Sequence, residues 1–242
     1  MKAVVLSAGF GTRLRPLTDD LPKVLLPVGG RPLVAHVIRH LAAHGFGEIV
    51  VNLHYRADLV RAALQDGAAL GARITYFEEP ELLGTAGTLA AVRPLLSEGE
   101  PFLVHYGDVL EAHDLTAMLA FHRERRALLT LLVHVRAGSN SVVVLDDEHR
   151  IVDYRERPPD DDPARARSSW VNSGVCVCDP GVLDHVPPPP CDLARDVLPA
   201  LAGRDDVYAH PLDGFRVVVD SPERYCQAQQ AVRDGLLPDA SR

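Results

Sequence analysis

Apolar residues in the first half of the chain follow two alternating patterns. Short apolar runs are typical of buried strands, and apolar residues spaced three and four apart are typical of amphipathic helices. The predicted strands lie near Lys2–Leu6, Glu48–Asn52, Arg73–Phe77 and Pro101–His105, and the predicted helices near Arg31–His44, Ala57–Gln65, Thr85–Leu96 and Asp114–Glu124. This alternation predicts an α/β fold in which helices cover both faces of a mostly parallel central sheet.

The second half of the chain is richer in strand patterns. Strands are predicted near Leu128–Arg136, Ser141–Leu145, Ile151–Tyr154, Trp170–Cys178 and Phe215–Val219, and helices over Leu193–Leu201 and from Pro222 to about Leu236. Ser221 directly before Pro222 is typical of an N-cap followed by the first helical residue. The proline-rich stretches Pro158–Ser169 and Pro187–Pro190 predict loops.

Three histidines, His36, His40 and His44, recur every four residues in the predicted helix over Arg31–His44. Residues at this spacing share one face of a helix. Apolar residues between them supply the stripe that a helix buries, so the histidines are expected to form a solvated polar stripe.

Composition narrows the class of protein. The chain has 242 residues, of which 47% are hydrophobic, and a formal net charge of −8. Its length suits one domain over residues 1–242. The acidic balance argues against nucleic-acid binding. No apolar stretch reaches transmembrane length, and no secretory signal pattern opens the chain. We expect a cytoplasmic protein with no membrane partner; the oligomeric state stays open, a homo-oligomer included.

The stretch Leu6–Pro27 carries the strongest chemical signal. Gly9 and Gly11 follow the first apolar run, and Arg13 and Lys23 lie beyond them. Glycines let the backbone approach a ligand closely, and successive N–H groups in such a turn form an anion site. Basic side chains add charge where phosphate oxygens would lie. The spacing completes neither G-x-G-x-x-G nor a P-loop, so the stretch predicts a polyphosphate site of another kind.

The whole stretch resembles the opening of the sugar-phosphate nucleotidyltransferases, or nucleoside-diphosphate-sugar pyrophosphorylases. Their pattern is close to L-A-x-G-x-G-T-R-L-x-P-L-T followed by P-K-x-L-x-P, with Ser7 here in place of the usual alanine. The resemblance implies a Rossmann-like three-layer α/β/α fold with a small β-rich sugar-binding region. It also implies Mg²⁺-dependent transfer of a nucleotidyl group from a nucleoside triphosphate to a sugar 1-phosphate, with residues 1–125 as the nucleotide half and 126–242 as the sugar-phosphate half.

The resemblance also implies residue roles in the nucleotide half. Arg13 and Lys23 would act on separate phosphates. Asp108, in a Gly-Asp pair after a predicted strand, would bind Mg²⁺ at the crevice where parallel strands end. The backbone around the glycines would hold the triphosphate, through Leu6, Ala8, Gly9, Gly11 and Thr12.

The segment Glu78–Gly87 resembles the part of the family that binds the nucleobase. Glu79 is the candidate for the base contact, although the sequence does not decide between Glu79, Glu78 and Glu81. Gly84 would let backbone groups approach the base, and Thr85 is expected to N-cap the following helix.

Two motifs resemble the family's sugar-phosphate contacts. Tyr154–Pro158 is similar to F-x-E-K-P, so Glu156 would accept sugar hydroxyls and Arg157 would grip the phosphate. Trp170–Gly174 is similar to V-N-A-G, which assigns Asn172 and Gly174 to the sugar.

The largest departure from the family pattern lies near the C-terminus. Val218 stands where a metal-binding aspartate is usual, and Asp220 follows two residues later. Asp220 is therefore the second candidate metal ligand. The segments Glu79–Gly87 and Gly107–Leu110 resemble guanylyltransferases acting on mannose or heptose 1-phosphate more than thymidylyltransferases. Cytidylyl, thymidylyl or uridylyl transfer, and a nucleotide-sugar-binding regulatory subunit, remain alternatives.

Overall fold

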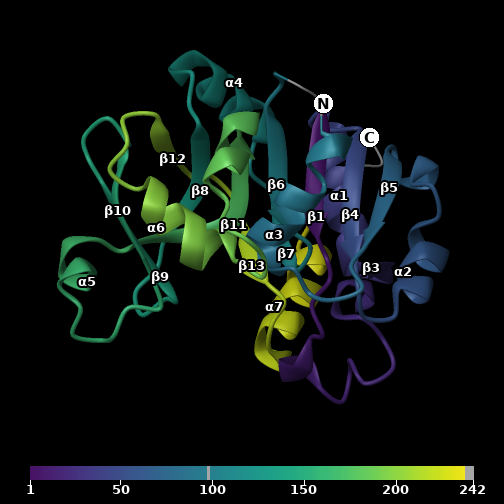
Figure 1. Cartoon of the computed structure of the whole chain (residues 1–242). Helices are drawn as coiled ribbons and strands as arrows, with labels where there is room; N and C mark the ends of the chain where they lie inside the picture. Colours follow the sequence, from purple (N-terminus) through teal and green to yellow (C-terminus); the bar gives the residue numbers. More distant parts are fainter. Residues whose placement is uncertain (97–98, 238–242) are drawn as a thin grey trace. The chain divides into compact units, whose positions relative to one another are not determined.

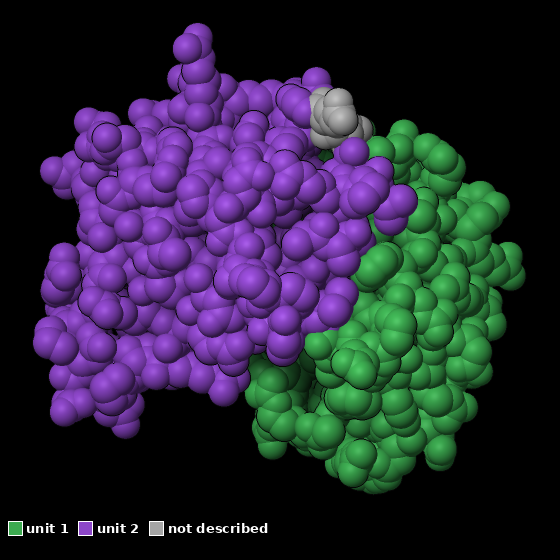
Figure 2. All heavy atoms as spheres, viewed as in Figure 1, with its two compact units in different colours: residues 1–82, 104–115, 213–242 green, residues 83–103, 116–212 purple. Residues whose placement is uncertain are grey.

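A computed structural model describes residues 1–96 and 99–237 of the chain. The residues group into two compact units, coloured separately in Figure 2. Unit 1 comprises Met1–Leu82, Val104–Leu115 and Asp213–Arg242, and unit 2 comprises Leu83–Leu103 and Thr116–Leu212. The single domain and the two halves expected from the sequence stay predictions.

Unit 1 is built on parallel strands (Figure 1). Its sheet has the order β6–β1–β4–β5, with β4 parallel to both β1 and β5. The core of the sheet is apolar, since Ala3, Val4, Val5 and Val51 are fully buried. The elements of this unit are β1 (Lys2–Leu6), β2 (Pro27–Val28), β3 (Arg31–Pro32), α1 (Leu33–Ala43), β4 (Glu48–Leu53), α2 (Ala57–Leu64), β5 (Arg73–Glu78), β6 (Phe102–Tyr106, of which Val104–Tyr106 belong here), β7 (Val109–Glu111), β13 (Arg216–Val218) and α7 (Pro222–Arg233).

A two-stranded ribbon adds residues 108–112 and 215–220 to unit 1. Strands β7 and β13 are antiparallel, with Val109 opposite Val218. The ladder extends beyond both strands, because the N–H of Val219 donates to the carbonyl of Asp108 (2.8 Å) and the N–H of Ala112 to that of Phe215 (3.0 Å). The ribbon therefore carries both candidate metal ligands, Asp108 and Asp220.

Unit 2 is built mainly on antiparallel strands. Strand β11 pairs with β8 and β9, β10 pairs with β9, and β12 lies parallel to β8. Its elements are α3 (Gly84–Ala91), α4 (Leu115–Arg125, which begins at the last residue of unit 1), β8 (Leu129–Val135), β9 (Ser141–Leu145), β10 (Ile151–Glu156), α5 (Pro163–Arg167), β11 (Trp170–Cys178), a π-helical turn (Leu193–Val197), α6 (Leu198–Leu201) and β12 (Val207–Pro211).

The sequence predicted most of these elements and missed four short strands and one short helix. The α/β fold with parallel strands and a β-rich region is confirmed, and Ser221 caps α7 by accepting from the N–H of Arg224. Strands β7 and β12 were not expected. The predicted loop Pro158–Ser169 contains α5, because Asp162 caps that turn through the N–H of Ala164.

The expected histidine stripe is wrong at one position. His40 is buried, and its ring lies 3.0 Å from a carboxylate oxygen of Glu111. The sequence could not show this, because the partner comes from a strand 71 residues further along the chain. Within the described part of the chain, no helix is both long and apolar enough to cross a bilayer.

A close approach joins the end of β1 to the turn before β7. The N–H of Gly107 donates to the carbonyl of Leu6 (2.9 Å), and a Cβ on Gly107 would lie 2.6 Å from Ser7 Oγ. Only glycine fits there. The Ser7 hydroxyl is itself buried and has no hydrogen-bond partner among the described residues, which is an unfavourable state for a polar group.

Replacing Ser7 by alanine should stabilise the protein. The variant Ser7→Ala removes a buried hydroxyl that makes no hydrogen bond, so we expect the free energy of unfolding to rise by about 1 kcal/mol. Ser173→Ala is the matched control, because Ser173 is also buried but its Oγ lies 2.9 Å from Nδ1 of His134. The control should lose about 1 kcal/mol. Urea denaturation measures both, and a less stable Ser7→Ala would contradict the assignment.

Candidate active site

The glycine loop of unit 1 forms an open set of backbone donors. It leaves β1 at Ser7 and closes in a 3₁₀ turn over Thr12–Leu14. Gly11 has a φ of 68°, and a Cβ there would lie 2.8 Å from the Cβ of Lys23, so glycine lets the loop pass close to that lysine. Among the described residues, the N–H groups of positions 8–13 donate to no protein acceptor. Such an array suits an anion.

Two ion pairs join the basic residues of the loop region to the ribbon. Lys23 Nζ pairs with Asp108 Oδ2, and both side chains are largely buried. Arg13, with a side chain 68% exposed, pairs with Asp220 Oδ2 at 3.0 Å. The other oxygen of Asp220 pairs with Arg224 at 2.8 Å. The four residues expected to carry the chemistry are thus brought together as two cation–carboxylate pairs.

A cavity of about 110 Å³ lies between these groups. Its lining is Gly11, Thr12, Arg13, Leu14, Lys23 and Asp220. Gly11, Thr12 and Arg13 of the loop and both cations therefore line one space within unit 1. This arrangement favours binding of a multiply charged anion.

Asp220 lies two residues after Val218, just beyond the end of β13. Val217 and Val219 are buried, whereas Val218 and Asp220 are partly exposed. The N–H of Asp220 donates to the carbonyl of Val218 (3.1 Å), so the chain turns here and no longer has the regular alternation of a strand. Val218 occupies the position where the resembled family usually has aspartate, and Asp220 is the partly exposed carboxylate that follows it.

A chain of hydrogen bonds joins the ends of three parallel strands. Asn52, at the end of β4, accepts from the N–H of Ser7 (2.6 Å) and donates to Glu79 Oε1 (2.8 Å). His54 Nδ1 donates to the carbonyl of Glu79 (2.8 Å). Glu79 is only 2% exposed, so at least one of its carboxylate oxygens is already engaged within the protein.

In unit 2, Thr85 makes contacts other than the expected cap. Helix α3 begins at Gly84, so Thr85 lies in its first turn, and the expectation that it caps the helix is wrong. Its hydroxyl donates to Asp192 Oδ1 (3.1 Å) and accepts from the N–H of Leu193 (2.8 Å). A Cβ on Gly84, whose φ is 76°, would meet the carbonyl of Cys191, so backbone packing requires this glycine.

The expected sugar-phosphate residues of unit 2 share one polar cluster. Tyr154 donates to Glu156 Oε2 (3.0 Å), and Asn172 Nδ2 donates to the Tyr154 hydroxyl (3.2 Å). The N–H of Gly174 donates to Asn172 Oδ1 (2.7 Å), in a part of β11 where the strand register shifts. Arg157 is largely exposed, with its Nε 3.8 Å from Glu156.

Burial is the main influence on the pKa of the Glu156 carboxyl. It raises the pKa of this carboxyl, and nearby Asp192 adds to the increase, whereas the Tyr154 hydroxyl and Arg157 oppose it. Because Asp192 also contacts Thr85, the polar residues of unit 2 form one connected group. Those of unit 1 form another.

Several residues of these groups were not found from the sequence. Asn52 had one signal, a polar residue that ends an otherwise apolar strand. Arg224 follows Asp220 by four residues, a spacing typical of a pair at the start of a helix. Tyr154 and Asp192 had no signal, because their roles depend on pairing between distant segments. No group of three or more His, Cys, Asp or Glu side chains in the described ranges is arranged to hold a metal ion.

Comparison with known proteins gives the family. The family described as "Nucleotidyl transferase" matches residues 2–213. The chain is 34% identical over 229 residues to the mannose-1-phosphate guanylyltransferase catalytic subunit beta of Dictyostelium discoideum, covering 93% of this chain and 62% of the relative. It is 34% identical over 242 residues to the mannose-1-phosphate guanylyltransferase of Mycobacterium tuberculosis, covering 98% and 66%. The chain thus spans somewhat less than two thirds of these relatives.

Solved structures agree on the fold. A structure described as a glucose-1-phosphate thymidylyltransferase from Bacillus anthracis matches with a TM-score of 0.82 and 20% identity, covering 97% of this chain and 96% of that one. A UDP-glucose pyrophosphorylase matches with a TM-score of 0.81 and 19% identity, covering 97% and 98%. At such identities the likeness supports the Rossmann-like architecture and no more. Because the family match spans most of the sequence, this chain belongs to the nucleotidyl transferase family.

Proposed function

We propose that this chain transfers a nucleotidyl group from a nucleoside triphosphate to a sugar 1-phosphate, with GTP and mannose 1-phosphate as the favoured pair. The observation that carries the proposal is the site in unit 1, where two cations and loop N–H groups that have no acceptor among the described residues lie beside one cavity. Family membership and the names of the relatives support the reaction and the favoured substrates.

The reaction needs positioning and charge neutralisation rather than a protein nucleophile. A phosphate oxygen of the sugar phosphate attacks the α-phosphorus in line, the bond to the β-phosphate oxygen breaks, and pyrophosphate leaves. The loop N–H groups suit the triphosphate, and Arg13 suits the leaving pyrophosphate. Lys23 lies deeper, beside Asp108, where its point charge suits the α-phosphate.

Entering phosphates change the partners of both cations. Without substrate, Arg13 and Lys23 neutralise Asp220 and Asp108. When phosphate oxygens take those cations, the two carboxylates lose part of their neutralising charge and become available for a positive ion. The site therefore couples the arrival of an anion to the arrival of a cation.

The donor set of unit 1 fits Mg²⁺. This ion is bound by one or two carboxylates together with substrate phosphate oxygens rather than by an all-protein cage. Asp108 and Asp220 offer two carboxylates on one ribbon, while no larger ligand cluster exists among the described residues. Mg²⁺ held there would neutralise charge that develops on the phosphates.

Sugar recognition is assigned to the polar cluster of unit 2. Glu156 and Asn172 are held by Tyr154, so their polar atoms are ordered for sugar hydroxyls. Exposed Arg157 suits the phosphate, and Gly174 completes the turn at Asn172. The base contacts expected from the sequence, Glu79 in unit 1 and Gly84 and Thr85 in unit 2, stay predictions. A cytoplasmic location and a homo-oligomer also stay predictions.

A substrate panel tests the function. Pyrophosphate release should be fastest with GTP and mannose 1-phosphate in the presence of Mg²⁺, by at least about 10-fold in kcat/KM over CTP, UTP or dTTP with other sugar phosphates. A higher rate with CTP would change the proposed base and keep the reaction. Tight binding of GDP-mannose with no turnover of any pair would contradict the proposed enzyme and favour a regulatory subunit.

Both carboxylates should be needed for turnover. We expect Asp108→Asn and Asp220→Asn each to lower kcat by at least about 100-fold, because each removes charge on which the transition state depends. Both variants should still fold, and without Mg²⁺ they should bind GTP at least as tightly as the parent protein does. Asp58→Asn is the control, because Asp58 is exposed on α2 and belongs to neither ion pair of the site. Near-parental turnover of Asp220→Asn would remove Asp220 from the site.

A further inference from the structure

A buried carboxylate lies on the same ribbon as the two candidate metal ligands. Glu111 is the last residue of β7, three positions after Asp108. Its side chain is completely buried, and its Oε1 lies 3.0 Å from His40 Nε2 and 3.5 Å from His105 Nε2. Its Oε2 accepts from the N–H of His113. Glu111 thus links the ribbon to α1 through His40 and to β6 through His105.

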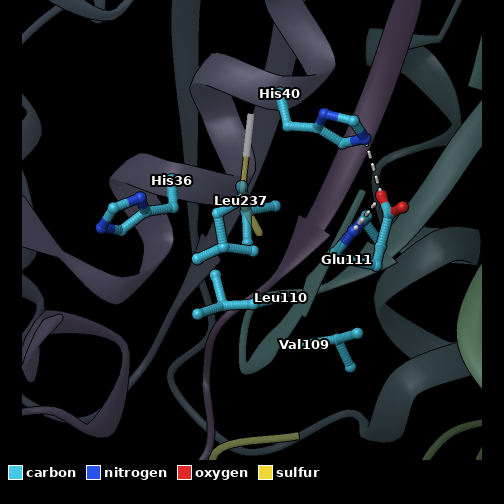
Figure 3. A pocket seen from close by; sticks show the side chains of 8 residues that line it. His36, His40, Val109, Leu110, Glu111 and Leu237 are labelled. Atoms are coloured by element: carbon cyan, nitrogen blue, oxygen red, sulfur yellow. Dashed lines mark ion pairs between the residues drawn. The ribbon is translucent and has the colours of Figure 1, made fainter. Parts of the chain in front are cut away.

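Figure 3 shows how these side chains are arranged. The carboxylate of Glu111 turns toward the ring of His40, whereas His36 lies across the pocket, beyond Leu110 and Leu237. His36 instead bonds the carbonyl of Val28 (2.8 Å). It therefore lines the same pocket without contacting the carboxylate.

Further contacts hold the two imidazole rings beside the carboxylate. His105 Nδ1 donates to the carbonyl of Tyr106 (2.8 Å), because a carbonyl only accepts. His40 Nε2 lies 3.1 Å from the carbonyl of His113 as well as 3.0 Å from Glu111 Oε1. Oε1 of Glu111 has no well-aligned hydrogen bond within the described chain, so its contacts with the two rings are close approaches rather than directed bonds.

The electrostatics agree with an ionised Glu111. Burial alone would raise its pKa, but the imidazoles of His105 and His40 beside the carboxylate outweigh burial and hold the pKa well below its usual range. A buried pair of this kind is costly to break, because removing one partner leaves an uncompensated charge. The link from the ribbon to α1 and β6 is therefore a strong one.

An isolated two-stranded ribbon is only marginally stable. The β7–β13 ribbon is packed through the buried side chains of Val109, Leu110, Val217 and Val219, and Glu111 adds a polar attachment three residues after Asp108. We propose that Glu111 is a positioning residue, which holds the ribbon through His40 and His105 and so presents the Asp108 carboxylate for the metal-dependent step. This inference rests on the proposed function. Residues one layer behind metal ligands commonly affect metal affinity or activity by 10–100-fold.

The variant Glu111→Gln tests the proposal, because it keeps the size of the side chain and removes its charge. We expect the Mg²⁺ concentration for half-maximal activity to rise about 10-fold while the KM for GTP changes less than about twofold. Mn²⁺ binding, followed by electron paramagnetic resonance in the presence of a GTP analogue, should weaken to a similar degree. His36→Gln is the matched control and should leave both values unchanged.

Amide hydrogen exchange gives a readout that does not depend on activity. The N–H groups of Val219 and Ala112, which close the ribbon, should exchange about 10-fold faster in Glu111→Gln, while those of β4 keep their rates. If Glu111→Gln does not fold, His105→Gln, which removes the imidazole that faces Glu111, decides the question in the same way. Unchanged ribbon exchange and unchanged Mg²⁺ dependence in a folded variant would overturn the proposal.

The proposed function and the positioning role of Glu111 are tested by different outcomes. Absence of Mg²⁺-dependent turnover in the parent protein would contradict the proposed function, whereas ribbon exchange would still decide whether Glu111 holds β7. Uniformly faster exchange across unit 1 would show a general structural role and would also overturn the positioning assignment.

Discussion

The site of unit 1 depends on the pairing of two cations with two carboxylates. Lys23 pairs with Asp108 and Arg13 pairs with Asp220, beside a cavity that Arg13, Lys23 and Asp220 line. Like charges gathered at this density would otherwise repel one another. The same pairing leaves the loop N–H groups as the unmatched donors, so the site is prepared for an anion that can replace the carboxylates as partner of Arg13 and Lys23.

Backbone geometry brings these charges together. The parallel sheet places the glycine loop after β1, and the β7–β13 ribbon places Asp108 next to the segment that carries Asp220. Buried polar groups then fix the surroundings. Asn52 ties Ser7 to Glu79 across three strand ends, and Glu111 ties the ribbon to His40 and His105. The polar side chains behind the site thus keep the site in one arrangement.

The sequence predicted what local pattern determines. Strands β1, β9 and β11 have the expected bounds, because apolar runs with clear ends specify them. Arg13, Lys23 and Asp108 were predicted to lie in one site because their motifs are contiguous. The roles of Asn52, Arg224 and Glu111 were not, since each depends on a partner from another element. The His40 ring was expected in solvent, because a helix pattern alone cannot reveal a buried carboxylate on a distant strand.

Calorimetry of nucleotide binding tests whether phosphate oxygens replace Asp220 and Asp108 as the partners of Arg13 and Lys23. A non-hydrolysable GTP analogue should bind the parent protein more tightly with Mg²⁺ than without it, and by linkage Mg²⁺ binding should gain by the same factor. In a double variant, Asp108→Asn with Asp220→Asn, the released cations should bind the analogue without Mg²⁺ at least as tightly as the parent does. The Mg²⁺ effect should then largely disappear. Weaker metal-free binding by the double variant, or an undiminished Mg²⁺ effect, would contradict the account.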